Sequence, residues 1–225
     1  WVAPIKGIQV LPIFHASLEL KWADKILLFD PSFDETILKR VEKPDIILLT
    51  DIHGDHLNPE ILAKLETVDL PIIAPQAVFD KLPATLQKKT KILSNGQTAS
   101  WKGIRIQAVA MYNLPGNKQI YHTKGRGNGY VLTMGGKKVY VSGDTEAVPE
   151  MRSLKGIDLA FVCMNLPYTM DVDQAASGVL AFKPKVVIPY HYRGEEGLSD
   201  IQKFKTLVQK GNPGVRVELL DFYKK

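Results

Sequence analysis

Apolar residues along the chain gather in short runs separated by turn residues, and this pattern predicts strands throughout the first half. Most runs are rich in Val, Ile and Leu, which suit the pleated, half-buried surface of a sheet. The run from Ile46 to Leu49 is apolar without interruption, as expected for a strand buried on both faces. The predicted strands span residues 8–14, 17–22, 26–30, 45–50, 71–74, 91–93, 98–101 and 104–112.

Helix signals separate some of these strands. Asn58 can cap a helix over residues 59–66, because its side chain can accept from the first turn and Pro59 suits the first helical position. A second, short helix is predicted over residues 76–82.

The pattern changes beyond residue 112. Residues 113–129 are rich in Gly, Asn and Lys and predict a loop, and a hairpin turned at Gly135 and Gly136 follows. Strands then alternate with helices, which indicates sheets at the centre and helices outside. The hairpin strands span 130–134 and 137–142, the later strands 159–164, 186–190 and 215–220, and the later helices 172–182 and 200–209.

Length and composition fit a globular protein. The chain has 225 residues, of which 45% are hydrophobic and 24% charged, and no low-complexity tract or long linker divides it. We therefore expect a single domain over residues 1–225. No apolar run approaches the roughly 20 residues needed to span a membrane. We expect a soluble protein, either cytoplasmic or, if a signal peptide preceded Trp1, periplasmic or secreted.

The charge balance suggests a partner class without fixing it. The net charge is +5 and the isoelectric point about 9.1, which invites a nucleic-acid hypothesis. The basic residues lie in short, scattered patches, which favours a solvated surface and a small-molecule substrate, anionic at most. The oligomeric state stays open. The single cysteine, Cys163, lies in an apolar run and is expected in the core rather than as a nucleophile.

Candidate chemistry lies where apolar strands end. The strand over 45–50 leads into Asp51-Ile-His53-Gly-Asp55-His56, the strand ending at Ser142 leads to Asp144, and the strand over 186–190 leads to His191. Ligand sites in α/β folds form at the carboxyl ends of strands, so these side chains are expected to converge on a divalent metal.

The spacing within residues 51–56 can serve two metal positions. If the segment is extended, Asp51, His53 and Asp55 share one side while His56 turns to the other. Gly54 is expected to allow the tight turn that this needs.

These motifs resemble a known family. Asp51-x-His53-x-Asp55-His56 resembles the His-x-His-x-Asp-His signature of the metallo-β-lactamase superfamily. Ser142-Gly-Asp-Thr145 is similar to its bridging-aspartate turn, and Pro189-Tyr-His191 to its last histidine. Residues 14–17 and 29–31 resemble the opening strands of the branch that contains ascorbate-lactone hydrolases. The resemblance implies a four-layer αββα sandwich in which helices flank two mixed sheets.

The resemblance also implies a ligand set. Asp51 and His53 would belong to a first metal position, while Asp55, His56 and His191 would belong to a second, and Asp144 would bridge the two. His122 is favoured over Asn113 as the remaining first-position ligand, because imidazole binds zinc or iron better than a carboxamide does. Asp51 stands where the family usually has His. Its anionic oxygen moves the preference from zinc, the favoured ion, towards manganese or iron, and leaves either one or two ions open.

The activity implied is hydrolysis of an ester, lactone or phosphodiester by metal-activated water. Asp55 would orient the nucleophile, His15 or Tyr190 would donate to the oxyanion, and Asp30 would hold a ligand histidine. Purely structural roles for His15, Asp30 and Tyr190 remain alternatives. The predicted substrate rim contains Lys124, Arg126, Asn165 and Tyr168, of which the two cations would meet an anionic group.

Two other functions stay open. The basic isoelectric point motivates a nuclease of the same superfamily, although the chain is short for the additional domain that such members carry. The unusual Asp51 and the undecided choice between Asn113 and His122 motivate a metal-binding scaffold without catalysis.

Overall fold

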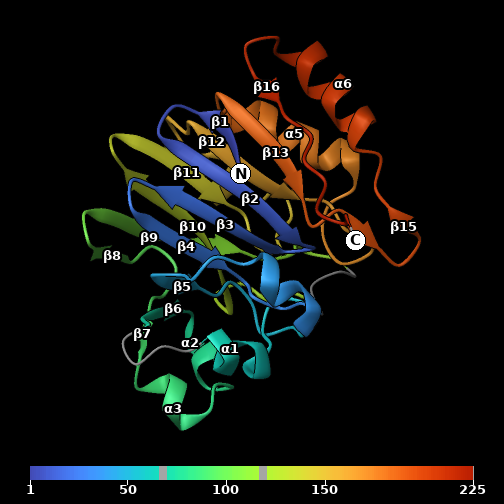
Figure 1. Ribbon diagram of the computed structural model, residues 1–225. Helices are drawn as coiled ribbons and strands as arrows, with labels where there is room; N and C mark the ends of the chain where they lie inside the picture. Colours follow the sequence, from blue (N-terminus) through green and yellow to red (C-terminus); the bar gives the residue numbers. More distant parts are fainter. Residues whose placement is uncertain (66–69, 117–120, 225) are drawn as a thin grey trace.

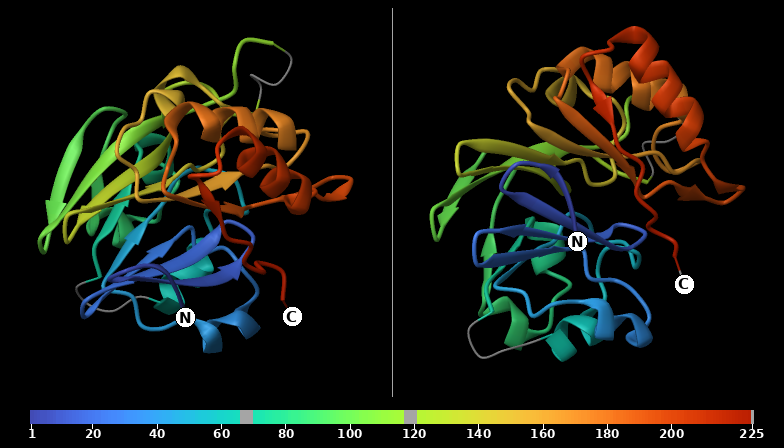
Figure 2. Two further views of the ribbon diagram at one scale, coloured as in Figure 1. Left: turned by 90° about the horizontal axis from the view of Figure 1, so that it is seen from above. Right: turned by 45° about the horizontal axis from the view of Figure 1, so that its top comes forward.

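Two seven-stranded mixed sheets pack face to face, with helices on both outer faces (Figures 1 and 2). The computed structural model describes residues 1–65, 70–116 and 121–224. The layers run helix, sheet, sheet, helix, which confirms the αββα sandwich. No helix among these described residues is long and apolar enough to cross a membrane.

The first sheet follows the chain order. Strands β1 to β4 are antiparallel, and β4 to β7 run parallel. The strands are β1 (Val2–Ile5), β2 (Ile8–Phe14), β3 (Ser17–Trp22), β4 (Lys25–Phe29), β5 (Ile46–Leu48), β6 (Ile72–Ala74) and β7 (Thr90–Ile92).

The second sheet has the order β16-β13-β12-β11-β10-β9-β8. Strands β8 to β11 are antiparallel, whereas β11, β12, β13 and β16 run parallel. The strands are β8 (Thr98–Trp101), β9 (Ile104–Met111), β10 (Gly127–Met134), β11 (Lys137–Val141), β12 (Leu159–Cys163), β13 (Val186–Tyr190) and β16 (Arg216–Val217). A small hairpin, β14 (Arg193–Gly194) with β15 (Gly197–Leu198), stands apart.

The helices divide between the outer faces according to the half of the chain that contains them (Figure 1). Beside the first sheet lie η1 (Glu35–Arg40), α1 (Pro59–Leu65), α2 (Gln76–Phe79) and α3 (Ala84–Gln87), and beside the second lie α4 (Pro149–Arg152), α5 (Val172–Phe182) and α6 (Ile201–Gly211).

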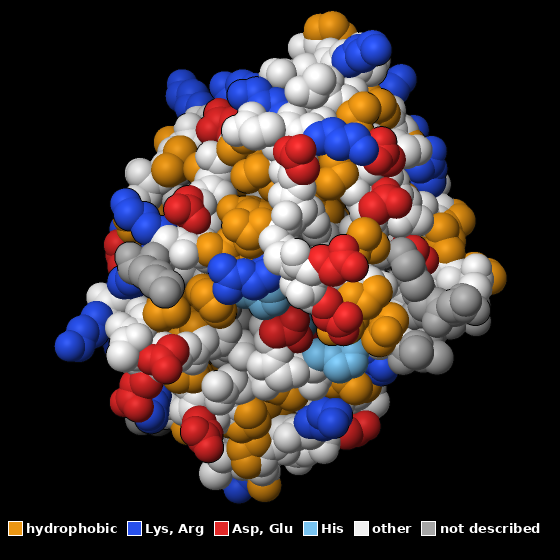
Figure 3. All heavy atoms as spheres, turned by 90° about the vertical axis from the view of Figure 1, so that its right-hand side faces the viewer, with side chains coloured by type: hydrophobic (Ala, Val, Ile, Leu, Met, Phe, Trp, Pro, Cys, Tyr) orange, Lys and Arg blue, Asp and Glu red, His pale blue; other side chains and the backbone are white. Residues whose placement is uncertain are grey.

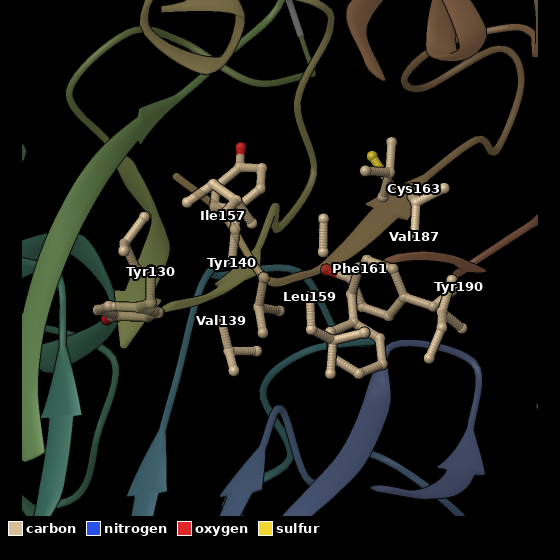
Figure 4. Close-up of a cluster of buried hydrophobic side chains, with 14 of the residues drawn as sticks. Tyr130, Val139, Tyr140, Ile157, Leu159, Phe161, Cys163, Val187 and Tyr190 are labelled. Atoms are coloured by element: carbon tan, nitrogen blue, oxygen red, sulfur yellow. The ribbon is translucent and has the colours of Figure 1, made fainter. Parts of the chain in front are cut away.

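The period-2 alternation of strand side chains separates two cores. Leu27 and Phe29 of β4 face the second sheet and join the large core between the sheets, whereas Leu28 packs outward with Leu62 of α1 and Val78 of α2. Figure 4 shows part of the large core, including Cys163. The Cys163 thiol is fully buried and burial raises its pKa to about 12, so the expected core position holds.

Several predicted boundaries differ from the structure. Strand β10 begins at Gly127, within the predicted loop, because its first residues pair with Met111 and Ala110 of β9. The predicted strand over 215–220 is only β16, two residues long. Strands β1, β14 and β15 and helices η1, α3 and α4 were not predicted, since each is short and lacks a clear period. The last residue of the predicted helix over 59–66, and residues 117–120 of the predicted loop, lie outside the described residues.

One buried carboxyl in this frame is costly. Glu19 of β3 has no exposed surface, and only its Oε2 accepts a hydrogen bond, from the Glu42 N–H at 3.3 Å. Burial raises the pKa of Glu19 to about 8, from the ordinary glutamate value of 4.5. Ionisation of Glu19 therefore opposes folding.

The pH dependence of stability should reveal this cost. The folded pKa lies above the unfolded value, so wild-type stability should fall as pH rises through the window from 4.5 to about 8. Replacement Glu19→Gln should leave the free energy of unfolding near wild type at pH 5 and raise it by on the order of 3 kcal/mol at pH 9. Urea unfolding at both pH values measures the difference, and an equal effect at both would contradict the assignment.

Candidate metal centre

The carboxyl ends of parallel strands from both sheets meet at one edge of the sandwich. Strand β5 leads to Asp51, β11 leads to Asp144 and β13 leads to His191. All three side chains are buried, with at most 3% exposure. On the face drawn in Figure 3, histidine side chains reach the surface next to acidic ones. The two sheets therefore bring together residues that are far apart in sequence.

The site residues form two groups of donor atoms. In each group the donor atoms lie within 4.8 Å of one another. The inner cluster contains Asp55, His56, Asp144 and His191, and the outer cluster contains Asp51, His53 and His122.

Asp144 lies between the two clusters. Its Oδ2 is 3.4 Å from the Nε2 of His56 and 3.2 Å from the Nε2 of His122, while its Oδ1 is 3.1 Å from the Nε2 of His191. One carboxylate therefore faces imidazoles of both clusters, as a bridging ligand would.

The inner cluster fits a divalent ion. Ligand atoms around a tetrahedral zinc with bonds of about 2.05 Å stand roughly 3.3 Å apart. The Nε2 of His191 lies 3.1 Å from the Nε2 of His56 and 3.3 Å from Oδ2 of Asp55. Two buried atoms of the clusters, Asp144 Oδ1 in the inner one and His122 Nε2 in the outer one, make no well-formed hydrogen bond to any described residue. A cation would satisfy all of these donors.

Carboxylates and imidazoles of the inner cluster shift one another's pKa. Burial would raise the pKa of Asp144, but the imidazoles of His191 and His56 outweigh it and hold that pKa well below its usual range. Burial would likewise raise the pKa of Asp55, but His56, His15 and His191 outweigh burial and lower it. In turn Asp144, Asp55 and Asp30 raise the pKa of His56 against burial. Asp55 and Asp144 therefore stay ionised although they are largely buried, and ionised carboxylates attract cations.

Asp30 fixes the orientation of His56. Its Oδ2 accepts from the Nδ1 of His56 at 2.8 Å, so Nε2 faces the cluster and would offer its lone pair to a bound cation. Thr50, which was not predicted, holds Asp30 through its N–H at 2.8 Å and its hydroxyl at 2.6 Å.

Asn113 plays the corresponding part for His122. Its Oδ1 accepts from the His122 N–H at 2.8 Å and lies 3.1 Å from the His122 Nδ1. The Nε2 of His122 then faces Asp144 and Asp51. The geometry therefore places the imidazole of His122 at the cluster and the Asn113 amide behind it.

His15 lies beside the inner cluster and is held by the last residues described. Its Nε2 is 3.4 Å from Oδ2 of Asp55, and its Nδ1 is 2.8 Å from the hydroxyl of Tyr223. The His15 N–H also donates to the carbonyl of Phe222. Burial and the neighbouring His191 lower the pKa of His15.

The backbone at three site residues is left-handed. His15, Asp30 and His191 have φ of 54°, 42° and 48°, a region that side chains other than Gly and Asn seldom adopt. Strain of this kind persists where packing enforces it, and often at functional sites.

The two clusters divide residues 51–56 as the resemblance implied, and not as an extended segment would. Asp55 lies with His56 in the inner cluster rather than with Asp51 and His53, because the chain turns here and the His56 N–H donates to the His53 carbonyl. Gly54 does not adopt a positive φ, and a Cβ there would meet open space. The turn does not require glycine.

Tyr190 lies away from any substrate. Its side chain is fully buried, and its hydroxyl accepts from the Gly143 N–H at 2.9 Å. Tyr190 does not line the pocket over the clusters, so donation to an oxyanion, one of the two sequence-based assignments, gains no support here. It instead supports the turn that carries Asp144.

The two cations predicted at the substrate rim are both engaged elsewhere. Lys124 donates to Glu150 at 2.6 Å and stands over the ring of Tyr112. Arg126 donates to the carbonyl of Tyr121 and lies 3.5 Å from Oδ1 of Asp51. Neither lines the pocket over the clusters, so their predicted contact with an anionic substrate is not supported.

The pocket over the clusters is lined by two of the predicted substrate-rim residues and by one residue that was not predicted. Asn165 and Tyr168 line it, as expected of the segment after β12. Tyr121 also lines it. One sequence signal pointed to Tyr121, its position directly before the predicted ligand His122. The composition of a loop does not reveal which way a side chain such as that of Tyr121 points.

Comparisons with known proteins agree with this geometry. The family model described as the beta-lactamase superfamily domain matches residues 25–192. A metal-dependent hydrolase of Thermoplasma acidophilum is 31% identical over 214 residues, covering 90% of this chain and 92% of the relative.

Solved structures give the same picture. A protein of Parabacteroides distasonis assigned as a metal-dependent hydrolase is 39% identical, with a TM-score of 0.84, covering 94% of this chain and 92% of the other. A metallo hydrolase of Ignicoccus hospitalis, 20% identical with coverage of 95% of both chains, shares the fold with a TM-score of 0.79. By its family match and these relatives, the chain belongs to the metallo-β-lactamase superfamily.

Proposed function

We propose that this metal-dependent hydrolase cleaves an ester or lactone of a small molecule with water activated at the two clusters. The observation that carries the proposal is the Asp144 carboxylate, which faces imidazoles of both clusters at 3.1 to 3.4 Å. A divalent ion, with zinc favoured by the mixed nitrogen and oxygen donors, would supply activated water and polarise the scissile carbonyl.

Asp55 is the residue best placed to orient water. Its side chain is 38% exposed, whereas the other carboxylates of the clusters are buried, and it is ionised at neutral pH. One carboxylate oxygen can accept a proton from attacking water at the pocket floor.

His15 can continue the proton path. Its Nε2 faces Asp55, and Tyr223 holds its other nitrogen. A proton taken up at Asp55 can pass to Nε2 of His15 and from there to the leaving oxygen.

The inner cluster should bind its ion more tightly than the outer one. The inner cluster has four donor residues, and His56 is oriented by Asp30. The outer cluster has three, His53 is 39% exposed, and Arg126 neutralises one oxygen of Asp51. A one-ion enzyme with the inner site filled is included in the proposal.

Removing the shared carboxylate tests the function. Asp144→Ala should lose metal from both clusters and reduce kcat/KM on a responsive ester or lactone by about 10³-fold or more, because several kcal/mol of stabilisation is lost. Elemental analysis of protein purified without chelators, with turnover on an ester, lactone and phosphodiester panel, measures both. Exposed Asp173→Ala is the control, and full turnover by Asp144→Ala would end the proposal.

A second variant tests the orientation of His56. Asp30→Asn removes the negative charge behind Nδ1, so we expect metal affinity at the inner cluster to fall by about 10–100-fold. Competition with a coloured chelator measures the affinity, and exposed Asp24→Asn should leave it unchanged. Unaltered affinity in Asp30→Asn would leave Asp30 with a structural role only.

The charge on Asp51 can be tested separately. Arg126→Gln should strengthen metal binding at the outer cluster by about fivefold, because an ion pair of this exposure contributes up to about 1 kcal/mol. The weaker of two binding phases in a metal titration should therefore shift while the tighter phase stays. A shift in the opposite direction would mean that Arg126 mainly orients Asp51.

A further inference from the structure

A pocket of about 360 Å³ opens over both clusters. This volume lies at the lower end of the range for small-molecule sites. Its floor consists of groups from the clusters, and its walls come from two loops that follow β9 and β12. The residues that line it are His53, Asp55, Tyr121, His122, Asp144, Asn165 and Tyr168.

Two aromatic rings form one wall. Tyr121 and Tyr168 pack edge to face, with ring centroids 5.1 Å apart and an angle of 82° between the planes. They come from separate loops, so the contact joins the two walls over the clusters. Both rings line the pocket and are only partly buried, so a third flat group can meet them in the edge-to-face or offset contacts that aromatic rings prefer.

Polar contacts hold both residues in place. The hydroxyl of Tyr168 donates to Oε1 of Glu195 at 2.6 Å, and the Glu195 N–H donates to the carbonyl of Leu166 at 3.0 Å. The backbone of Tyr121 is fixed by Arg126. Because these contacts already order Tyr168 and Tyr121, the two residues lose little further conformational entropy when a flat group binds to their rings.

The charge of the rim disfavours an anion. Glu195 brings a carboxylate to the outer edge of the Tyr168 ring, and acidic side chains adjoin the histidine surfaces in Figure 3. Lys124 and Arg126, the cations predicted at the rim, are paired with Glu150 and Asp51. Beside Tyr168, away from the clusters, an uncharged substrate group meets no repulsion from Glu195, whereas a carboxylate would.

We propose that the pocket takes an uncharged substrate carrying an aromatic or similarly flat, conjugated group beside the bond to be cleaved. This substrate class rests on the proposed hydrolase function, since the clusters set where that bond must lie. The scissile carbonyl would lie over Asp55 and Asp144, and the flat group would lie against Tyr168 and Tyr121.

Three methyl esters with the same scissile bond test the proposal. They are methyl phenylacetate, methyl cyclohexylacetate, and methyl (4-carboxyphenyl)acetate, which is aromatic but anionic. For the metal-loaded wild type we expect the first ester to have a KM up to about tenfold below that of the cyclohexyl ester, because of the aromatic contact, and below that of the anionic ester, because Glu195 repels its carboxylate.

Substitutions of Tyr168 and Tyr121 test whether the preference for the aromatic ester arises at this wall. Tyr168→Leu should remove the preference by raising KM for methyl phenylacetate about tenfold at similar kcat, whereas Tyr168→Phe should retain most of it. Tyr121→Leu is the second ring variant in case the first fails to fold, and it leaves the backbone bond to Arg126 intact. Exposed Trp1→Leu is the control for loss of an aromatic residue elsewhere.

A binding measurement separates this proposal from the catalytic one. Saturation-transfer NMR with phenylacetamide and cyclohexylacetamide, which need not be cleaved, should show preferential binding of the aromatic amide that Tyr168→Leu abolishes. Preferential binding without cleavage of any ester would overturn the proposed ester hydrolysis and support the aromatic site. Equal binding of both amides, or a lower KM for the anionic ester, would overturn the substrate class whether or not the enzyme is active.

Discussion

Negative charge buried where the two sheets meet is the constraint on which the site depends. The Asp30, Asp51 and Asp144 carboxylates have almost no exposed surface, and an unpaired carboxylate in such a place is costly. The fold offsets this cost with imidazoles and backbone N–H groups, and a divalent cation would complete the compensation. The same charges that would destabilise an empty interior therefore make this edge of the sandwich a place for a metal.

The sandwich determines how these charges are arranged. Parallel strands of both sheets end at one edge, so residues separated by more than a hundred positions, such as His56 and His191, bring their Nε2 atoms within 3.1 Å. Behind the donors stand Asp30 and Asn113, each directed at the far nitrogen of one histidine. The pocket walls come from longer loops, which can vary without disturbing the strands beneath. Metal binding and substrate choice thus depend largely on different residues, and they meet in the loop where Tyr121 directly precedes His122.

The sequence was most informative where physical signals are periodic or local. Apolar runs predicted most strands, and the polar residues after three of them pointed to the metal centre. Short elements such as β14 and α4 gave no such signal. The positions of Tyr190, Lys124 and Arg126 were missed for a different reason. Residue type and loop position do not tell whether a side chain faces the cavity or a neighbour, and here Gly143, Glu150 and Asp51 provide partners that only the tertiary structure places.

The contact between His15 and Tyr223 has a consequence for biosynthesis. The two residues are 208 positions apart, and the Phe222 carbonyl also accepts from the His15 N–H. On the ribosome, His15, which directly follows β2, emerges long before Tyr223 does. His191, which packs edge to face against the His15 ring with centroids 4.0 Å apart, also comes late. Loading of the inner cluster must therefore follow synthesis of nearly the whole described chain, and a nascent chain would hold its early acidic residues without the groups that later balance them.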